Sequence, residues 1–452
     1  MTGTIAAIAT PLGTGGMAVI RMSGPAAIAR AGQVFVPIRG KRPEDMDGYT
    51  CAYGHILEDG TRLDDVVLTV FRAPHSYTGE DVVEVSCHGG RYVSEQILRA
   101  LLCDEVRLAE AGEFTKRAFL NGKLSLTQAE AVADVIGAAG ENALRAARAL
   151  REGATYRRIS ALGQRLLEML SDLAVWADYP DEDIPDVDGG ALERRLAALQ
   201  QDMQSLLATY DRGRILREGM HTVIAGKPNV GKSTLFNALA GFERSIVTDI
   251  AGTTRDVVEE QIRIGGMTLR LSDTAGVRET DGTVERIGVE RSLRSLEEAD
   301  LVLAVFDMSR PFDAEDAALL ERLPRERCIC VCNKTDLDRQ LAQLPEGFAD
   351  TVAISAKTED NMAALADAVT RFAAARAVNA EDGMIANERQ RDCLREAAAA
   401  VAEAQDALAM GLAYDAVTVS LDAAADALLR LTGERVTDRV VDTVFARFCV
   451  GK

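Results

Sequence analysis

One short segment, Gly226-Lys-Pro-Asn-Val-Gly-Lys-Ser233, restricts the fold of this chain more than any other feature. It has the Gly-x-x-x-x-Gly-Lys-Ser spacing of a phosphate-binding loop, in which backbone N–H groups curl around phosphates. Such a loop needs a strand before it and a helix after it, and Thr222 to Ala225 and Thr234 to Ala240 have those patterns. Lys232 is expected to bind the β- and γ-phosphates, and Ser233 to ligate Mg²⁺. The segment predicts a doubly wound α/β domain.

Three further motifs follow in order, each at the end of a predicted strand. Asp273-Thr-Ala-Gly276 offers a carboxylate to Mg²⁺ through water and an amide to the γ-phosphate. Asn333-Lys-Thr-Asp336 offers a carboxylate that accepts two N–H bonds from guanine, a pair that adenine does not present in that arrangement. Ser355-Ala-Lys357 offers backbone amides to the guanine oxygen. Each fragment alone could be structural, but the four in this order predict a GTP site.

Between the first two motifs lies a polar segment, Ile246 to Asp256, with a Gly-Thr-Thr run. A threonine hydroxyl there would complete the Mg²⁺ shell and close the loop on the γ-phosphate, and Thr254 is the candidate ligand. A plain surface loop is the alternative. The residues expected to contact GTP are Asn229, Val230, Gly231, Lys232, Ser233, Thr234, Thr248, Asp249, Ile250, Ala251, Gly252, Thr253, Thr254, Asp273, Thr274, Ala275, Gly276, Asn333, Lys334, Asp336, Ser355, Ala356 and Lys357.

The residue that orients the attacking water is not where many small GTPases have it. Those enzymes carry glutamine directly after Asp-x-x-Gly. This chain has Val277 there, whose aliphatic side chain cannot hold water. Glu279, Asp281 and Glu285 lie just downstream, and for each of them an ordinary surface role is equally open.

The hydrophobic pattern changes along the rest of the chain and predicts a multidomain α+β and α/β protein. Residues 1–117 contain short β-like runs, such as Met17 to Met22 and Val82 to Cys87, and predict a small α+β domain. Residues 118–217 and 376–452 carry apolar side chains at helical spacing and predict one α-helical domain. The P-loop GTPase domain, residues 218–375, would be inserted in it.

Composition excludes some classes of protein. The formal net charge of −19 argues against binding nucleic acid by overall charge, so any RNA contact needs a local basic patch. No run of residues is apolar enough to span a membrane, and a secretory signal is not expected at the N-terminus. Cys328, Cys330 and Cys332 alternate along one predicted strand, which favours small core side chains over a zinc or redox role. A cytoplasmic location with reduced thiols is expected.

The nucleotide segment resembles the potassium-activated TrmE-Era-EngA-type GTPases, whose phosphate loop reads Gly-x-Pro-Asn-x-Gly-Lys-Ser. The resemblance implies a K⁺ site formed by Asn229 with the backbone of Thr248, Ile250 and Thr253. A potassium ion there could supply the positive charge that an arginine finger supplies elsewhere.

The flanking regions resemble the tRNA-modifying MnmE (TrmE) family of these GTPases. The motifs that carry this resemblance are Ala9-Thr-Pro-Leu-Gly-Thr-Gly-Gly16, Ile20-Arg-Met-Ser-Gly24, Ser76-Tyr-Thr-Gly-Glu-Asp81, His88-Gly-Gly90, Gly112-Glu-Phe-Thr115, Arg117 to Lys123, Leu126 to Ala131 and the terminal Phe448-Cys-Val-Gly-Lys452. Leu12 and Val450 depart from the usual proline and isoleucine without affecting a polar role. Thr280 to Thr283 match the family only loosely. The assignment of the family's catalytic glutamate to Glu285 therefore relies on the match of the following Arg286-Ile-Gly288.

This family resemblance implies a homodimer joined through N-terminal domains that bind a tetrahydrofolate derivative, in its 5-formyl or 5,10-methylene form. Arg21, Glu84, Lys123 and Lys452 would contact the folate. With an FAD- and NADH-using partner, MnmG, in a heterotetramer or larger complex, such a protein adds a (carboxymethyl)aminomethyl group to C5 of the wobble uridine of certain tRNAs. A catalytic and an incidental role for Cys449 both stay open.

Two other readings of the G domain stay open at this point. A ribosome-assembly factor should carry a basic RNA-binding domain after its G domain, whereas this chain returns to an acidic, Ala-rich helical pattern. A regulatory switch would differ from a tRNA-modifying GTPase chiefly in not binding folate.

Overall fold

The computed structural model describes residues 3–11, 13–138, 140–178, 188–242, 259–264, 266–272, 295–340, 346–375, 380–446 and 448–451. Contacts divide the chain into two compact units, one of Met1–Ala133 with Asp422–Lys452 and one of Asp134–Leu421. These units are not the three predicted domains, whose boundaries stay a prediction.

The first unit is built on a seven-stranded sheet in the order β3-β4-β5-β6-β2-β1-β7. Neighbouring strands are antiparallel except β1 and β7, which are parallel. The strands are β1 (Thr4–Ile8), β2 (Met17–Ser23), β3 (Phe35–Pro37), β4 (Thr50–Glu58), β5 (Thr61–Phe71), β6 (Val82–His88) and β7 (Val106–Leu108). The β-like runs in the sequence therefore predict this sheet correctly.

Helices α1 (Ala27–Val34) and α2 (Arg91–Leu101) pack on the sheet and bury one core with it. Ile20, Val85 and Leu68 from the strands meet Ile97 from α2 in this core, and all four are fully buried. A second core joins α3 (Glu113–Leu120), the start of α4 (Leu126–Gly137) and α15 (Asp438–Phe445), which brings the C-terminal segment into this unit.

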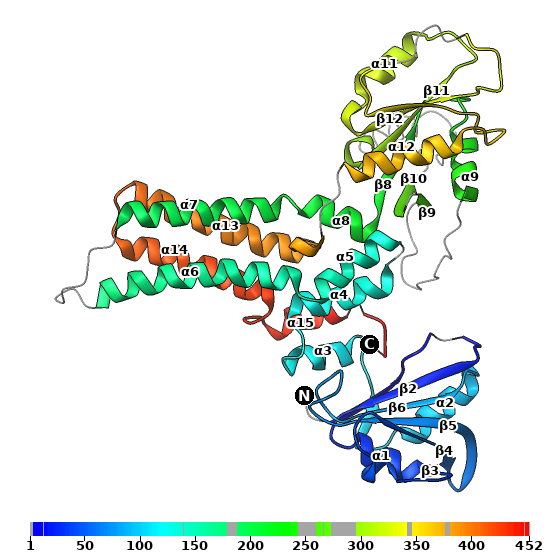
Figure 1. Ribbon diagram of the computed structural model, residues 1–452, viewed down its shortest axis with the longest axis vertical. Helices are drawn as coiled ribbons and strands as arrows, with labels where there is room; N and C mark the ends of the chain where they lie inside the picture. Colours follow the sequence, from blue (N-terminus) through cyan, green and yellow to red (C-terminus); the bar gives the residue numbers. More distant parts are fainter. Residues whose placement is uncertain are drawn as a thin grey trace, which may run out of the picture. The chain divides into compact units, whose positions relative to one another are not determined.

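The helical part contains the long helices α6 (Ala154–Asp178), α7 (Gly189–Leu207), α13 (Glu388–Ala409) and α14 (Tyr414–Thr432) (Figure 1). Helix α7 buries Leu192, Leu196, Leu199 and Met203, at spacings of four and three, against α6 and α13. The remaining helices here are α5 (Glu141–Arg151) and α8 (Tyr210–Glu218). None of the described helices is long and apolar enough to cross a membrane.

The second unit contains a six-stranded sheet in the order β13-β12-β11-β8-β10-β9. Only β9 and β10 pair antiparallel, and the other neighbours are parallel. The strands are β8 (Met220–Ala225), β9 (Glu259–Ile264), β10 (Met267–Ser272), β11 (Leu301–Asp307), β12 (Cys328–Asn333) and β13 (Asp350–Ala353). Parallel strands leave their carboxyl ends at one edge, where loops bind ligands in such sheets.

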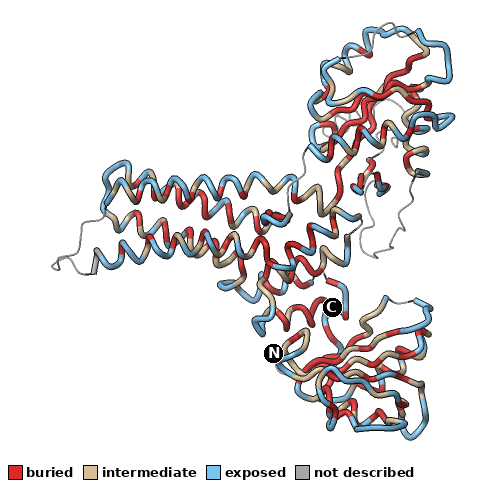
Figure 2. The backbone as a smooth tube through the Cα atoms, in the orientation of Figure 1, coloured by how far each residue is buried: buried red, intermediate tan, exposed pale blue. Residues whose placement is uncertain are grey.

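Helices cover both faces of this sheet, which makes it doubly wound as predicted. Helices α9 (Lys232–Phe242) and α12 (Met362–Ala374) pack on one core, and α11 (Ala314–Arg322) packs on the other. Figure 2 shows the central strands as buried. The three alternating cysteines of β12 all face the α11 side at 0% exposure, and burial raises the pKa of the Cys328 thiol to about 12. They are core side chains.

Candidate functional site

The predicted phosphate-binding loop joins β8 to α9 and is hydrogen-bonded to Asn333 at the end of β12. Strand β8 is largely buried and ends at Ala225. Helix α9 begins at Lys232, so residues 226–231 form the loop. Gly231 has a φ of +101°, and a Cβ atom on it would lie 2.3 Å from Nδ2 of Asn333. Only glycine fits there, because the neighbouring motif lies directly against the loop.

The loop holds its own lysine in place. Nζ of Lys232 donates to the carbonyl oxygens of Gly226 and Lys227, at 2.8 Å each. Ser233 and Thr234 follow in the first turn of α9 and are exposed, as residues that bind a phosphate or its metal ion must be.

Asn333 connects the phosphate-binding loop to the third motif. Its side chain is almost fully buried, Nδ2 donates to the Val230 carbonyl at 2.8 Å, and Oδ1 accepts from the Ala356 N–H at 2.9 Å. One amide thus fixes the separation of the two loops expected to hold the phosphates and the base.

Lys334 makes a second connection to the same loop. It has a φ of +70°, and its Nζ donates to the Asn229 carbonyl at 2.8 Å and to Oδ2 of Asp307 at 2.6 Å. Burial favours a raised pKa for Asp307, but hydrogen bonds from Lys334 and Ser309 outweigh it and hold the pKa below its usual value. Asp307 is therefore ionised and fixes the lysine.

Asp336 is the residue of the third motif that is expected to bind the base. It is exposed, and one of its oxygens, Oδ1, accepts from the buried Ser355 hydroxyl at 2.7 Å. Ser355 Oγ also accepts from the Thr358 N–H at 3.3 Å. The carboxylate is thereby oriented while its outer face stays open to a base with paired N–H groups.

The structure therefore brings three of the four predicted motifs together at the carboxyl edge of the second sheet. The candidate residues outside its described part are Thr248, Asp249, Ile250, Ala251, Gly252, Thr253, Thr254, Asp273, Thr274, Ala275, Gly276 and Glu285. Asp307 was not among the candidates, although a signal existed: it is a carboxylate that ends an entirely apolar run, Leu301 to Phe306.

Arg21 and Glu84, two of the four proposed folate ligands, pair across strands β2 and β6. Their side chains are 2.7 Å apart, and the Arg21 guanidinium lies 5.9 Å from the Tyr77 ring and 5.6 Å from the Phe114 ring. Its NH1 also lies 3.5 Å from the carbonyl of Gly451, near the chain end. Charged groups and aromatic rings thus converge at one place on this sheet.

Lys123, the third proposed folate ligand, contacts the segment from Pro74 to Gly79. Its Nζ donates to the carbonyl of Pro74 at 3.1 Å, and its side chain also packs beside Gly79. Lys452 lies outside the described residues. Among the described folate candidates, Arg21 and Glu84 are in direct contact.

A buried charge network supports the region around Tyr77. Arg117, 1% exposed, donates to Glu113 at 3.0 Å, to Glu80 at 3.0 Å and to the Gly3 carbonyl at 2.9 Å. Burial favours a raised pKa for Glu113, yet hydrogen bonds from Arg107, the Glu110 N–H and Arg117 lower that pKa below its usual value. Arg117 thus links the motifs that contain Glu80 and Glu113 through ion pairs.

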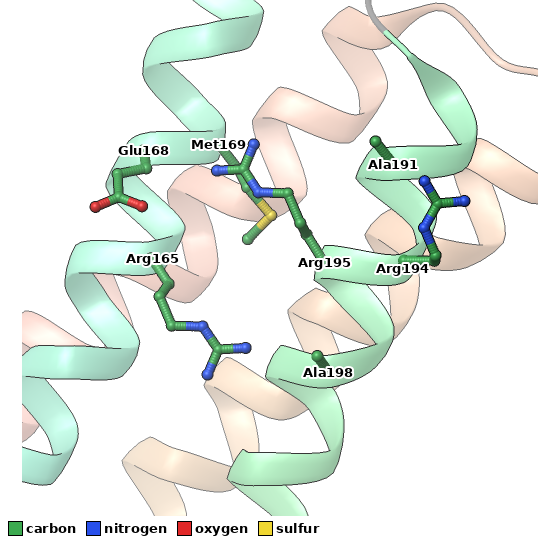
Figure 3. Close-up of a pocket in the computed structure, with 7 residues that line it drawn as sticks. All are labelled: Arg165, Glu168, Met169, Ala191, Arg194, Arg195 and Ala198. Atoms are coloured by element: carbon green, nitrogen blue, oxygen red, sulfur yellow. The ribbon is translucent and has the colours of Figure 1, made fainter.

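A pocket of about 340 Å³ between α6 and α7 does not suit an anion, although arginines line it (Figure 3). Arg165 pairs with Asp202 at 2.5 Å, and Arg195 with Asp172 at 2.6 Å. Arg194 lies 4.0 Å from Asp188, and Glu168 adds a further carboxylate. With three cations facing four carboxylates, the pocket has no surplus positive charge.

Comparisons with known proteins match the whole length of the chain. The family model of the MnmE helical domain matches residues 126–449, and that of the GTP-binding protein TrmE N-terminus matches residues 4–123. A tRNA modification GTPase MnmE of Clostridioides difficile (strain 630) is 41% identical over 455 residues, which cover 99% of each chain. The chain belongs to the MnmE family of tRNA modification GTPases.

A second curated relative also matches over the full length of the chain. The tRNA modification GTPase MnmE of Carboxydothermus hydrogenoformans is 40% identical over 460 residues, which cover 100% of each chain. Among solved structures, Era in complex with MgGDPNP and a 16S ribosomal RNA fragment is 28% identical over 34% of this chain and 56% of its own, with a TM-score of 0.27. The two family models and the full-length relatives confirm the MnmE-family resemblance of the motifs.

Proposed function

We propose that this MnmE-family chain binds GTP at the edge of the second sheet and hydrolyses it as part of a tRNA modification reaction. The observation that carries the proposal is Asn333, which joins the phosphate-binding loop to the base-recognition loop through two hydrogen bonds at 2.8 and 2.9 Å. A GTPase assay tests it. Lys232→Ala should abolish measurable turnover because Lys232 supplies the charge that binds the β- and γ-phosphates.

Mg²⁺ fits the residues of this site. The exposed hydroxyl of Ser233, with Thr254 as the second proposed ligand, gives the hard oxygen donors that Mg²⁺ prefers beside phosphates. When bound, the ion would neutralise charge on the phosphates. We assign the orientation of the attacking water to Glu285, and Glu285→Ala should bind GTP normally but hydrolyse it slowly. Near-normal turnover of this variant would assign the role to another residue.

Potassium activation rests on Asn229, with Thr248, Ile250 and Thr253 as the further proposed ligands. Asn229 is exposed on the loop with a φ of +64°, and its backbone carbonyl is already bound by Lys334, so the side-chain oxygen is the group offered to a cation. Hydrolysis should be faster in KCl than in NaCl at equal ionic strength. Equal rates would remove the K⁺ site from the proposal.

We also propose that the first unit binds a tetrahydrofolate derivative that supplies the one-carbon unit. The convergence of Arg21, Glu84 and the partly exposed Tyr77 supports this, since a reduced pterin offers N–H groups to a carboxylate and ring atoms that pack on an aromatic side chain. Calorimetry with 5-formyltetrahydrofolate tests it. Arg21→Ala should weaken binding, whereas Arg91→Ala, an exposed cation of the same unit that pairs with Glu95, should not.

The reaction proposed for the whole protein is addition of a (carboxymethyl)aminomethyl group to C5 of the wobble uridine, as a homodimer working with MnmG. We place this reaction in the cytoplasm, consistent with cysteines that form no disulfide within the described part of the chain. Nucleoside mass spectrometry of total tRNA, with and without the gene, tests this reaction. Unchanged nucleosides would leave the GTPase activity intact and favour a regulatory role.

A further inference from the structure

The phosphate-binding loop contains a second lysine whose side chain is held by helix α11. Lys227 is 8% exposed, and its Nζ lies 2.5 Å from Oδ1 of Asp313 and 3.4 Å from Oδ2 of Asp316. Glu315 Oε2 lies 3.3 Å from the same atom. Three carboxylates thus bind this ammonium group, which leaves Lys232 as the loop lysine expected to face the phosphates.

The carboxylates that bind Lys227 are themselves fixed. Asp313 is the N-cap of α11, and its Oδ1 accepts from the backbone N–H groups of Glu315 at 2.9 Å and Asp316 at 3.1 Å. Asp316 Oδ2 in turn accepts from the Asp313 N–H at 3.2 Å. This capping box gives Lys227 a rigid anchor outside the loop.

The anchored residue also holds Lys232. The backbone carbonyl of Lys227 accepts a hydrogen bond from Nζ of Lys232, at 2.8 Å. Two residues later, the carbonyl of Asn229 is bound by Lys334. The loop is therefore fixed at both ends of the segment 227–229, at one end by α11 and at the other by the base-recognition motif.

A gain in folding stability is a weak explanation for the ion pairs of Lys227. The pairs with the exposed carboxylates of Asp313 and Glu315 contribute little because solvent screens them, and in the buried pair with Asp316 desolvation of the charges offsets their attraction. These ion pairs do restrict geometry, and small displacements of phosphate-binding groups have large effects on binding and rate.

We propose that Lys227 is a positioning residue for GTP: its ion pairs with Asp313 and Asp316 fix the loop backbone that places Lys232 against the phosphates. This goes beyond the proposed function, since it assigns α11 a part in nucleotide binding without contact with the nucleotide.

The test measures GDP affinity, and KM and kcat for GTP, in the full chain. Lys227→Met should weaken GDP binding about tenfold and raise KM more than it lowers kcat, because the phosphate contacts are displaced in both substrate and product complexes. Lys227→Arg, which keeps the charge, should recover most of the affinity. Arg371→Met, which breaks an exposed pair with Asp350 in the same unit, is the matched control and should change nothing.

A second variant separates positioning from folding. Asp313→Asn retains a good N-cap for α11 while removing the charge that faces Lys227, so it should fold even where Lys227→Met does not. Its loss of GDP affinity should not add to that of Lys227→Met, because both variants break one interaction. GDP affinity within twofold of wild type in either variant, or fully additive losses in the double variant, would overturn the proposal.

Discussion

Asp336 has one hydrogen-bond partner among the described side chains, the Ser355 hydroxyl at 2.7 Å, and is otherwise exposed. This geometry suits a carboxylate that accepts two N–H groups of guanine. Asp336→Asn would put a donor where guanine also has a donor, and should weaken GTP binding by about 1–3 kcal/mol. The same amide could donate to the C2 oxygen of xanthine, so XTP should become the better substrate.

Comparison of KM for GTP and XTP checks this change of base. Asp338→Asn, an exposed carboxylate two residues along, is the matched control and should keep the preference for GTP. Retention of that preference by Asp336→Asn would assign base recognition to other groups.

Glu113 should make the first unit sensitive to acid. Its pKa in the folded chain is held below the usual value, against the effect of burial, by Arg107, the Glu110 N–H and Arg117. A depressed pKa means that this stabilisation is present above the unfolded pKa and is lost as pH falls through the folded pKa. Glu113→Gln should therefore cost about 3 kcal/mol at neutral pH and much less in acid.

Calorimetric unfolding of wild type and Glu113→Gln, at neutral pH and at several acid values, measures this difference. Glu95→Gln, on an exposed pair with Arg91, should show no comparable change. A difference between wild type and Glu113→Gln that stays constant with pH would show that the pair does not titrate as argued.

At the scale of elements, α7 depends on the apolar side chains that it buries against α6 and α13. Leu199 is fully buried near the middle of that row. Leu199→Ala should destabilise the chain by about 2–5 kcal/mol through lost burial and a residual cavity, with kcat for GTP unchanged below the unfolding transition. Leu167→Ala, on an exposed face of α6, is the control and should leave the melting temperature nearly unchanged. Equal shifts for the two would contradict the packing described.

The elements themselves were largely predictable from sequence. Short β-like runs predicted β2 and β6, and the cysteine-containing apolar run before Asn333 predicted the buried strand β12. The partners of Lys227 were not predictable, because α11 lies over 80 residues along the chain and nothing local indicates that its cap faces the loop. The same holds for Arg21 and Gly451, which the fold brings together from opposite ends of the sequence.

At the scale of the whole molecule, the C-terminal residues belong structurally to the first unit. Val450 forms a β-bridge with Ala111, and the Gly112 N–H donates to the Cys449 carbonyl at 3.3 Å. Gly451 has a φ of +95° and packs so tightly that a Cβ on it would lie 2.5 Å from the Ile8 carbonyl. Residues 449–451 therefore pack in the first unit, with the Gly451 carbonyl beside Arg21.

Deletion of residues 449–452 should separate the two proposed activities. Loss of the bridge at Ala111, of the Gly451 carbonyl beside Arg21 and of the proposed ligand Lys452 should weaken 5-formyltetrahydrofolate binding about tenfold. Turnover of GTP by the protein alone should stay within twofold, because none of the three motifs that meet at the second sheet includes these residues. Cys449→Ser in the full-length chain is the control: it leaves the backbone contacts in place, so its folate affinity should match wild type. A deletion that binds folate normally would remove the C-terminal segment from that site.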